Sequence, residues 1–191
     1  MPIRRRPLAL MASLCLALSL TACSTLPPPG IQPVNGFELQ RYSGQWYEIA
    51  RLDHRFERGM SDVRATYTPQ ADGSVAVLNR GFDTASGRWQ QALGRAYFNA
   101  DPATASLKVS FFGPFYGGYH VVALDPAYRW AMVAGNDRSY LWLLARDRQL
   151  PDDVKTRLLT QARGLGFDTD KLIWVSQQRG DDAPPAANEG R

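Results

Sequence analysis

Few side chains in this sequence can carry out catalysis or bind a metal. Histidine occurs only at His54 and His120, and neither lies at a spacing typical of metal ligands. The Gly-x-Ser-x-Gly motif of serine hydrolases is absent. His120 falls within an expected strand, where a hydrogen-bonded structural histidine is the commoner case, whereas His54 lies in an expected loop and can in principle activate water. We therefore expect no catalytic residue and no metal site; ester hydrolysis near His54 is the less favoured alternative.

The first 22 residues have the pattern of a signal peptide. Arg4 to Arg6 give it a positive start, and an apolar run from 8 to 20 follows that is too short to cross a bilayer comfortably. The run ends in Leu20-Thr21-Ala22-Cys23, which resembles the bacterial lipobox, a cleavage site directly before a lipid-modified cysteine. An ordinary secretory signal followed by a chance cysteine is the alternative.

Cys23 is the expected point of lipid attachment. The other cysteine, Cys15, lies in the segment that is removed, so the mature chain keeps Cys23 alone and forms no disulfide. The lipobox resemblance implies a diacylglycerol thioether and an N-linked acyl chain such as palmitate on this residue, and no other cofactor. Several acyl chains give stable anchoring. Ser24 stands where inner-membrane lipoproteins tend to carry Asp, which favours the outer membrane, at its periplasmic face.

The charge of the chain argues against a nucleic-acid partner. The formal net charge is +4, but three of the 22 basic residues are the arginines of the signal peptide. The remaining 19 basic residues stand against 18 acidic ones, and no basic run replaces the lost arginines. The electrostatic footprint of a nucleic-acid binder is therefore missing.

One folded domain is expected between two polar ends. Residues 23–36 contain four prolines, which indicates an extended, Pro-rich tether behind the lipidated cysteine rather than core. The domain is expected to span 37–178, and the polar segment 179–191 has the composition of a disordered tail.

Eight strand-like runs with no helix between them predict an antiparallel sandwich or a closed barrel. Turn signals such as Asp72-Gly73, Asp101-Pro102 and Asn136-Asp137 separate the runs. A helix follows from Pro151, with Val154, Leu158, Ala162 and Leu165 as its apolar stripe, and a short strand covers 172–175. The eight runs are 46–53, 63–68, 75–81, 89–98, 106–112, 119–124, 129–134 and 140–146.

Several motifs in order resemble the lipocalin family. Gly44-Gln45-Trp46 is similar to its Gly-x-Trp signature, and the stretch from Trp46 to Arg51 is similar to the branch with bacterial lipocalins, apolipoprotein D and plant temperature-induced lipocalins. The stretches 111–119 and 140–146 resemble the bacterial outer-membrane members. The resemblance covers about 37–177 and implies an all-β, eight-stranded, antiparallel up-and-down barrel with one C-terminal helix and a short final strand. A departure occurs at the Thr-Asp-Tyr motif, where Asp125 is followed by Pro126-Ala127-Tyr128.

The resemblance also implies a sealed barrel base and an internal ligand site. Arg146 is expected to lie across the face of Trp46, rather than as a solvated surface charge. Strand alternation then turns Leu144, Leu107, Gly94 and Ala123, among others, toward the interior. The expected ligand-binding residues are Phe56, Met60, Tyr67, Val77, Asn79, Phe98, Val109, Phe111, Tyr119, Val121, Tyr140 and Trp142. The alternative is that these side chains only fill a core.

The lipocalin resemblance implies fatty acids or lysophospholipids as ligands, for storage, transport or repair of membrane lipid. Arg55 and Arg58 in the first hairpin loop are expected either to meet a headgroup or to be solvated. A structural envelope lipoprotein without a ligand, or a lipid-modifying esterase, are the alternatives. A homodimer is also expected from family members, and the apolar turn 113–116 is its candidate contact.

Overall fold

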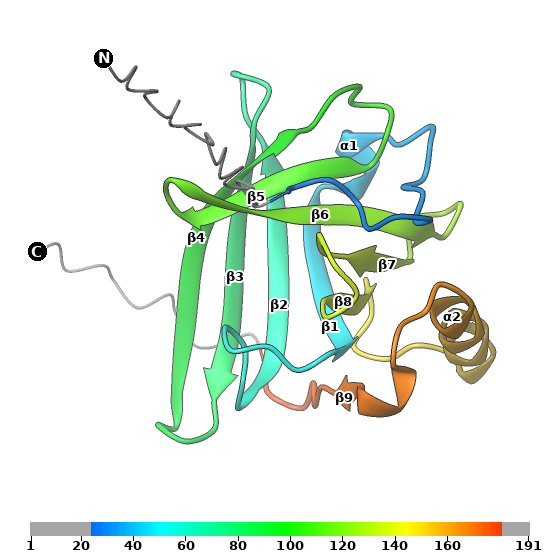
Figure 1. Ribbon diagram of the computed structural model, residues 1–191. Helices are drawn as coiled ribbons and strands as arrows, with labels where there is room; N and C mark the ends of the chain where they lie inside the picture. The colour runs from blue at the N-terminus through cyan, green and yellow to red at the C-terminus, as the bar shows by residue number, and fades with distance from the viewer. Residues whose placement is uncertain (1–23, 181–191) are drawn as a thin grey trace, which may run out of the picture.

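The computed structural model describes residues 24–180 (Figure 1). The expected signal peptide, Cys23 and the tail from 181 onward lie outside the described residues. Within 24–180, no helix is both long and apolar enough to cross a membrane.

Eight antiparallel strands of the described chain close into a barrel, as the lipocalin resemblance implies (Figure 1). Each strand pairs with the next along the chain, and β1 pairs with both β2 and β8, which closes the sheet. Each strand of the barrel is therefore paired on both sides over at least part of its length. The strands are β1 (Gly44–Arg51), β2 (Met60–Pro69), β3 (Val75–Asp83), β4 (Arg88–Phe98), β5 (Ser106–Phe112), β6 (Phe115–Leu124), β7 (Trp130–Ala134) and β8 (Leu141–Ala145).

The β2–β3 turn shows how local sequence sets the strand register. Gly73 adopts a φ of 80°, a left-handed conformation that favours glycine. The Asp72 carboxylate accepts hydrogen bonds from the backbone N–H and the hydroxyl of Ser74. The resulting hairpin pairs Pro69 with Val75 and fixes which side chains of both strands face inward.

Register shifts in β1 and β6 change the expected alternation of side chains. The pairing of β6 with β7 shifts between Val121 and Ala123, so Ala123 joins the core cluster on the outside of the barrel. The expectation that Ala123 faces the interior is therefore wrong, because a bulge reverses the strand's faces. A similar shift in β1 lies between Glu48 and Ala50.

The C-terminal helix packs against the outer wall of the barrel. Helix α2 (Asp152–Gly164) lies on the β7–β8 side in Figure 1 and buries Val154, Leu158 and Ala162. The partly buried Leu165 packs against the same cluster, as the stripe predicts. The 3-10 turn η1 (Thr169–Lys171) then leads into β9 (Ile173–Trp174), which pairs with β1.

The segment before the barrel packs against it, in contrast to the expected tether. Ile31 is only 2% exposed and belongs to the core. The backbone N–H of Val34 donates to the carbonyl of Val121, and its carbonyl accepts from Ala105. These bonds tie the segment to Val121 within β6 and to Ala105, directly before β5. Helix α1 (Leu39–Tyr42) follows and covers one end of the barrel.

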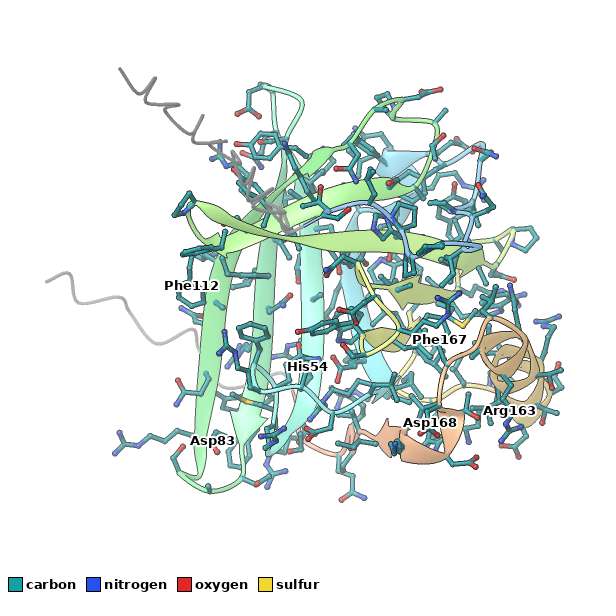
Figure 2. All side chains as sticks on the ribbon, in the orientation of Figure 1. His54, Asp83, Phe112, Arg163, Phe167 and Asp168 are labelled. Carbon is teal, nitrogen blue, oxygen red and sulfur yellow. The ribbon has the colours of Figure 1, made fainter. Side chains whose placement is uncertain are left out.

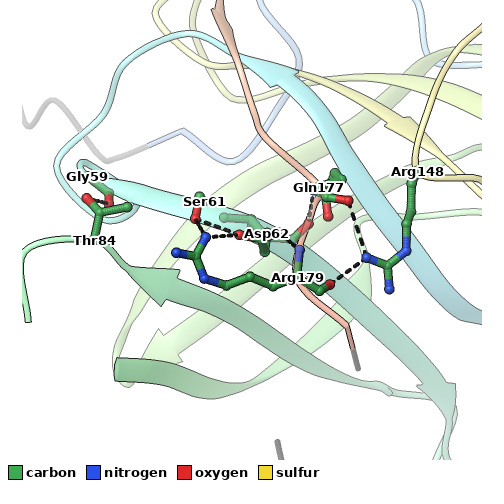
Figure 3. A network of polar contacts seen from close by, with 8 residues as sticks. Gly59, Ser61, Asp62, Thr84, Arg148, Gln177 and Arg179 are labelled. Atoms are coloured by element: carbon green, nitrogen blue, oxygen red, sulfur yellow. Dashed lines mark hydrogen bonds and ion pairs between the residues drawn. The ribbon is translucent and has the colours of Figure 1, made fainter. Parts of the chain in front are cut away.

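A C-terminal strap, residues 175–179, bridges the end of β1 and the start of β2, and Figure 3 shows its Gln177 and Arg179 beside Asp62. Val175 donates to the carbonyl of Ile49, and the side-chain amide of Gln177 donates to the carbonyls of Glu48 and Val63. Arg179, expected to begin the disordered tail, binds Asp62 through its backbone N–H and its guanidinium. The strap therefore completes the barrel wall where the two strands diverge.

We expect Gln177→Ala to lower the free energy of unfolding by about 2 kcal/mol, because two buried carbonyls lose their donor. Urea denaturation followed by circular dichroism measures this. Gln161→Ala, at an exposed position of α2, is the matched control and should change stability by less than about 0.5 kcal/mol. Equal effects of the two substitutions would mean that the strap contributes nothing.

Candidate functional site

A cavity of about 800 Å³ lies inside the barrel. Ten of the twelve residues expected to bind ligand line it, namely Phe56, Met60, Tyr67, Val77, Asn79, Val109, Phe111, Tyr119, Tyr140 and Trp142. This volume shows that the barrel interior is not filled by its own side chains, and the lining is largely apolar. A cavity of this kind is suited to an apolar ligand.

Phe98 and Val121 are the two expected ligand residues that the cavity lining does not include. Val121 is fully buried in the core cluster at the closed end, and the Phe98 ring lies 6.2 Å from that of Phe37. Both were expected to face the ligand because they follow the inward alternation. The segment around Phe37 and α1 occupies the space in front of them, so the cavity ends above these positions.

The floor of the barrel contains the expected tryptophan–arginine contact. Trp46 is fully buried, and the Arg146 guanidinium carbon lies 4.0 Å from the centre of its rings. The indole N–H donates to the carbonyl of Tyr42. The guanidinium donates to the carbonyls of Gln45, Arg41, Tyr42, Ser43 and Tyr128. Arg146 therefore joins α1, the start of β1 and the β6–β7 turn into one plug.

The departure from the Thr-Asp-Tyr motif leaves this plug intact. Tyr128 adopts a φ of 58°, and its N–H donates to the carbonyl of Asp125, which forms a tight turn. The turn brings the Tyr128 hydroxyl to within 2.9 Å of the backbone nitrogen of Glu38, from which it accepts a hydrogen bond. The displaced tyrosine thus holds the start of α1 in place.

Three tyrosines form the deep end of the cavity. The hydroxyl oxygens of Tyr42 and Tyr119 are 2.6 Å apart, and the Tyr67 ring lies 5.4 Å and 5.7 Å from their rings. Burial raises the pKa of each hydroxyl above its ordinary value. All three are therefore neutral at physiological pH and turn their rings toward the cavity. Tyr42 was not expected, since no sequence signal marks the short helix that carries it.

Charged side chains lie at the mouth of the cavity, under the loop between β1 and β2. The Arg51 guanidinium donates to the Glu48 carboxylate at 2.6 Å and to the carbonyls of Glu57 and Met60. The Glu57 carboxylate accepts from the indole of Trp142 at 3.2 Å and lies 3.0 Å from His54 Nε2. This network fastens the loop to β1 and β8 over the barrel interior.

The two carboxyl groups of this network differ in their pKa. Burial, together with the charge of Glu57, raises the pKa of Glu48 well above its ordinary value. Burial also opposes ionisation of Glu57, but hydrogen bonding and charge from His54 outweigh it and lower the pKa. The loop is therefore held at neutral pH by an ionised Glu57. Sequence reasoning missed both glutamates and Arg51, because charged residues are rarely buried.

His54 is enclosed by aromatic rings rather than exposed in a loop. Its ring lies 5.2 Å from Trp142, 5.7 Å from Tyr140 and 6.2 Å from Phe56, and it is 7% exposed. The cavity lining contains no serine, threonine or cysteine beside it. No group of three metal-ligating side chains occurs within residues 24–180. Among the described residues, His54 is therefore held by Glu57 and by these aromatic rings.

The two loop arginines expected to meet a headgroup have different surroundings. Arg55 lines the cavity and lies 5.0 Å from the Phe56 ring centre. Arg58 points to solvent, where it forms an ion pair with Asp53 at 2.7 Å. Of the two, only Arg55 is placed to meet the polar end of a ligand in this cavity.

His120 is a structural residue outside the cavity. It is fully buried in β6, and its Nδ1 lies 3.1 Å from the hydroxyl of Ser106. Burial lowers the pKa of His120 from 6.5 to about 4. Hydrogen bonds with the backbone of residues 25 and 26 raise this pKa, but by less than burial lowers it. The ring is therefore neutral at physiological pH.

This pKa predicts a loss of stability in acid. Below pH 6.5 the unfolded chain protonates His120, whereas the folded chain does so only near pH 4, so stability falls as pH drops across this window. The contribution is at most about 3 kcal/mol. Chemical denaturation at pH 7 and pH 4 should show a smaller pH-dependent loss for His120→Gln than for the parent chain. Equal losses would contradict a neutral, buried imidazole.

An up-and-down barrel with an apolar interior, a tryptophan–arginine floor and a helix on its outer wall defines a lipocalin-type binding protein. The profile of the lipocalin-like domain matches residues 37–177, and the chain belongs to the lipocalin family. The lipocalin relatives of this chain are binding proteins.

Among curated relatives, the chain is 53% identical over 173 residues to the outer membrane lipoprotein Blc of Escherichia coli. The matched region covers 90% of this chain and 98% of the relative. It is 37% identical over 168 residues to temperature-induced lipocalin-1 of Arabidopsis thaliana, covering 83% and 87% of the two chains. Relatives named Blc place this chain at the bacterial outer membrane. Insecticyanin of Manduca sexta has the same fold, with a TM-score of 0.64, 22% identity and 78% and 87% coverage.

Proposed function

We propose that this lipocalin binds one fatty acid or lysophospholipid in the barrel, while a lipidated Cys23 anchors it to the periplasmic face of the outer membrane. The observation that carries the ligand proposal is the apolar cavity of about 800 Å³, whose deep end is formed by three neutral tyrosines. Each CH₂ transferred from water contributes about 0.8 kcal/mol, so a tail of about a dozen carbons gives about 10 kcal/mol before ordering costs. Burial of the tail alone can therefore hold the ligand, without a covalent bond to the protein.

The polar end of the ligand belongs at the mouth in this proposal. Arg55 supplies a positive charge there, and Tyr140 and Trp142 supply an aromatic wall. Glu57 and His54 are already paired with each other, so they hold the loop and leave Arg55 to the headgroup. A barrel that served only as a structural envelope component would have no need of the cavity.

Fluorescence titration tests the proposal. Full-length mature chain, freed of co-purified lipid, is titrated with a fatty acid brominated next to its carboxyl group, which places the quencher beside Trp142. We expect saturable quenching with a stoichiometry of one. The Trp142→Phe variant should bind ordinary fatty acid equally well but lose most of the quenching. Linear, unsaturable quenching of both proteins would overturn the proposal and favour a structural lipoprotein.

A further inference from the structure

The outer surface of three neighbouring strands lacks acidic residues. Strands β4, β5 and β6 contain no Asp or Glu, but they contain Arg88, Arg95 and Lys108. Large apolar side chains on or beside the same surface are exposed: Leu93 by 64%, Phe112 by 70% and Phe115 by 76%. We call the surface formed by Leu93, Arg95, Tyr97, Lys108, Ser110, Phe112, Phe115 and Tyr116 the outer β4–β6 face.

The outer β4–β6 face is continuous. Strand pairing sets Arg95 opposite Ser110 and Tyr97 opposite Lys108. The Lys108 ammonium lies 5.3 Å from the centre of the Tyr116 ring, which is itself 6.4 Å from the ring of Tyr97. Apolar and basic side chains therefore alternate over one wall of the barrel. Arg95 also pairs with Asp72 of the β2–β3 turn at 3.1 Å, at the edge of the face.

The start of the described chain lies beside this face. The carbonyl of Thr25 accepts a hydrogen bond from the side-chain amide of Asn99, directly after β4. Leu26 follows and is 60% exposed. Cys23 is two residues before Thr25, and consecutive Cα atoms are about 3.8 Å apart, so a lipid on Cys23 begins close to the outer β4–β6 face. This step rests on the lipid anchor of the proposed function.

The opposite side of the molecule carries no net charge. Helix α2 and the segment after it carry the exposed residues Asp152, Asp153, Asp168 and Asp170, which are balanced by Lys155, Arg157, Arg163 and Lys171. Figure 2 shows Asp168 on the α2 side and Phe112 on the far side of the barrel. An anionic bilayer therefore attracts the outer β4–β6 face and has no net electrostatic attraction for the α2 side.

We propose that the outer β4–β6 face docks on the lipid bilayer that carries the Cys23 anchor. Phe112, Phe115 and Tyr116 also line the mouth of the cavity, so docking brings the mouth against the bilayer surface. A lipid tail then passes between bilayer and barrel with less exposure to water. A second copy of the chain fits less well, because strands β4, β5 and β6 offer no acidic residue to pair with Arg95 and Lys108 of the other copy.

The test uses the full mature chain, lipidated at Cys23, in vesicles of phosphatidylethanolamine and phosphatidylglycerol in equal parts. A lipidated Cys23 leaves the mature chain without a free thiol, so single cysteines can be labelled with an environment-sensitive fluorophore. Ser110→Cys reports on the outer β4–β6 face, and Gln161→Cys reports on α2. Spin-labelled headgroup lipid should quench the probe at 110 about threefold or more strongly than the probe at 161. Equal quenching at both positions would overturn the proposal.

Charge reversal separates docking from mere anchoring. The double variant Arg95→Glu/Lys108→Glu should lower the docked population about fivefold for each charge. The quenching of the probe at position 110 should fall accordingly. The matched control Arg163→Glu/Lys171→Glu reverses two paired, exposed charges near α2 and should leave this quenching unchanged. Neither pair lines the cavity, so the fatty-acid titration should be unaffected in both variants.

The remaining outcomes have separate readouts. Quenching at 110 that persists after reversal of Arg95 and Lys108 would overturn the proposal. Cross-linking between copies labelled at 110 in detergent, abolished by the same reversal, would assign the face to a second copy instead. A mature chain without acyl mass, which does not float with vesicles, would overturn the anchor and the docking together. Failure of the fatty-acid titration alone would overturn only the ligand proposal.

Discussion

Arg146→Ala is expected to lower the free energy of unfolding by about 3–4 kcal/mol. The substitution removes the cation over Trp46 and the donor to the five backbone carbonyls that Arg146 binds at the barrel floor. Those carbonyls belong to α1, to the start of β1 and to the β6–β7 turn, so one deletion loosens the plug at three places. Urea denaturation monitored by tryptophan fluorescence measures the change.

Arg146→Lys tests whether the planar guanidinium matters or only its charge. A lysine ammonium is a point charge with three donors and cannot reach carbonyls on several sides at once. We expect it to recover less than half of the lost stability. Arg163→Ala, on the exposed end of α2, is the control and should be close to neutral. Full recovery by lysine would show that the carbonyl contacts add little.

Ala92→Trp is expected to weaken fatty-acid binding about 60-fold. Ala92 lines the cavity, so an indole at this position occupies the space of roughly three CH₂ groups of the ligand, each contributing about 0.8 kcal/mol. Because the cavity is empty of protein side chains, the new ring fits inside and the fold should keep most of its stability. Calorimetric titration with a long-chain fatty acid measures the loss.

Leu93→Trp is the matched control for this substitution. Leu93 is the next residue of β4 and points to the opposite side of the sheet, where it is exposed. It adds the same indole without entering the cavity, so its affinity should equal that of the parent chain. If both variants bind alike, the ligand lies outside the barrel and the site described above is wrong.

The order of the elements and the contact at the barrel floor could be predicted because each has a local or repeated signal. Alternating apolar residues between turn signals marked the strands, and helical spacing marked α2. Trp46 and Arg146 are far apart in the sequence, but the Gly-x-Trp motif and the end of the eighth run identified them. Eight of the ten lining residues followed from alternation once the inward face of each strand was set, and Phe56 and Met60 followed from their place in the expected first hairpin loop.

The missed features depend on contacts that no local pattern encodes. The bulge at Ala123 reverses the faces of β6, and a single inserted residue is invisible in an apolar run. The burial of Ile31 depends on where the N-terminal segment crosses the barrel. Glu48 and Arg51 look like surface residues by type and are buried only because each partners the other.

Anomalous scattering from a crystal grown with a fatty acid brominated at its methyl end locates the bound tail in the protein. We expect one bromine position per chain, deep in the barrel against the rings of Tyr67 and Tyr119, with the carboxylate near Arg55. A bromine signal only on the outer surface, or an interior filled by rearranged side chains, would contradict a ligand site inside the barrel.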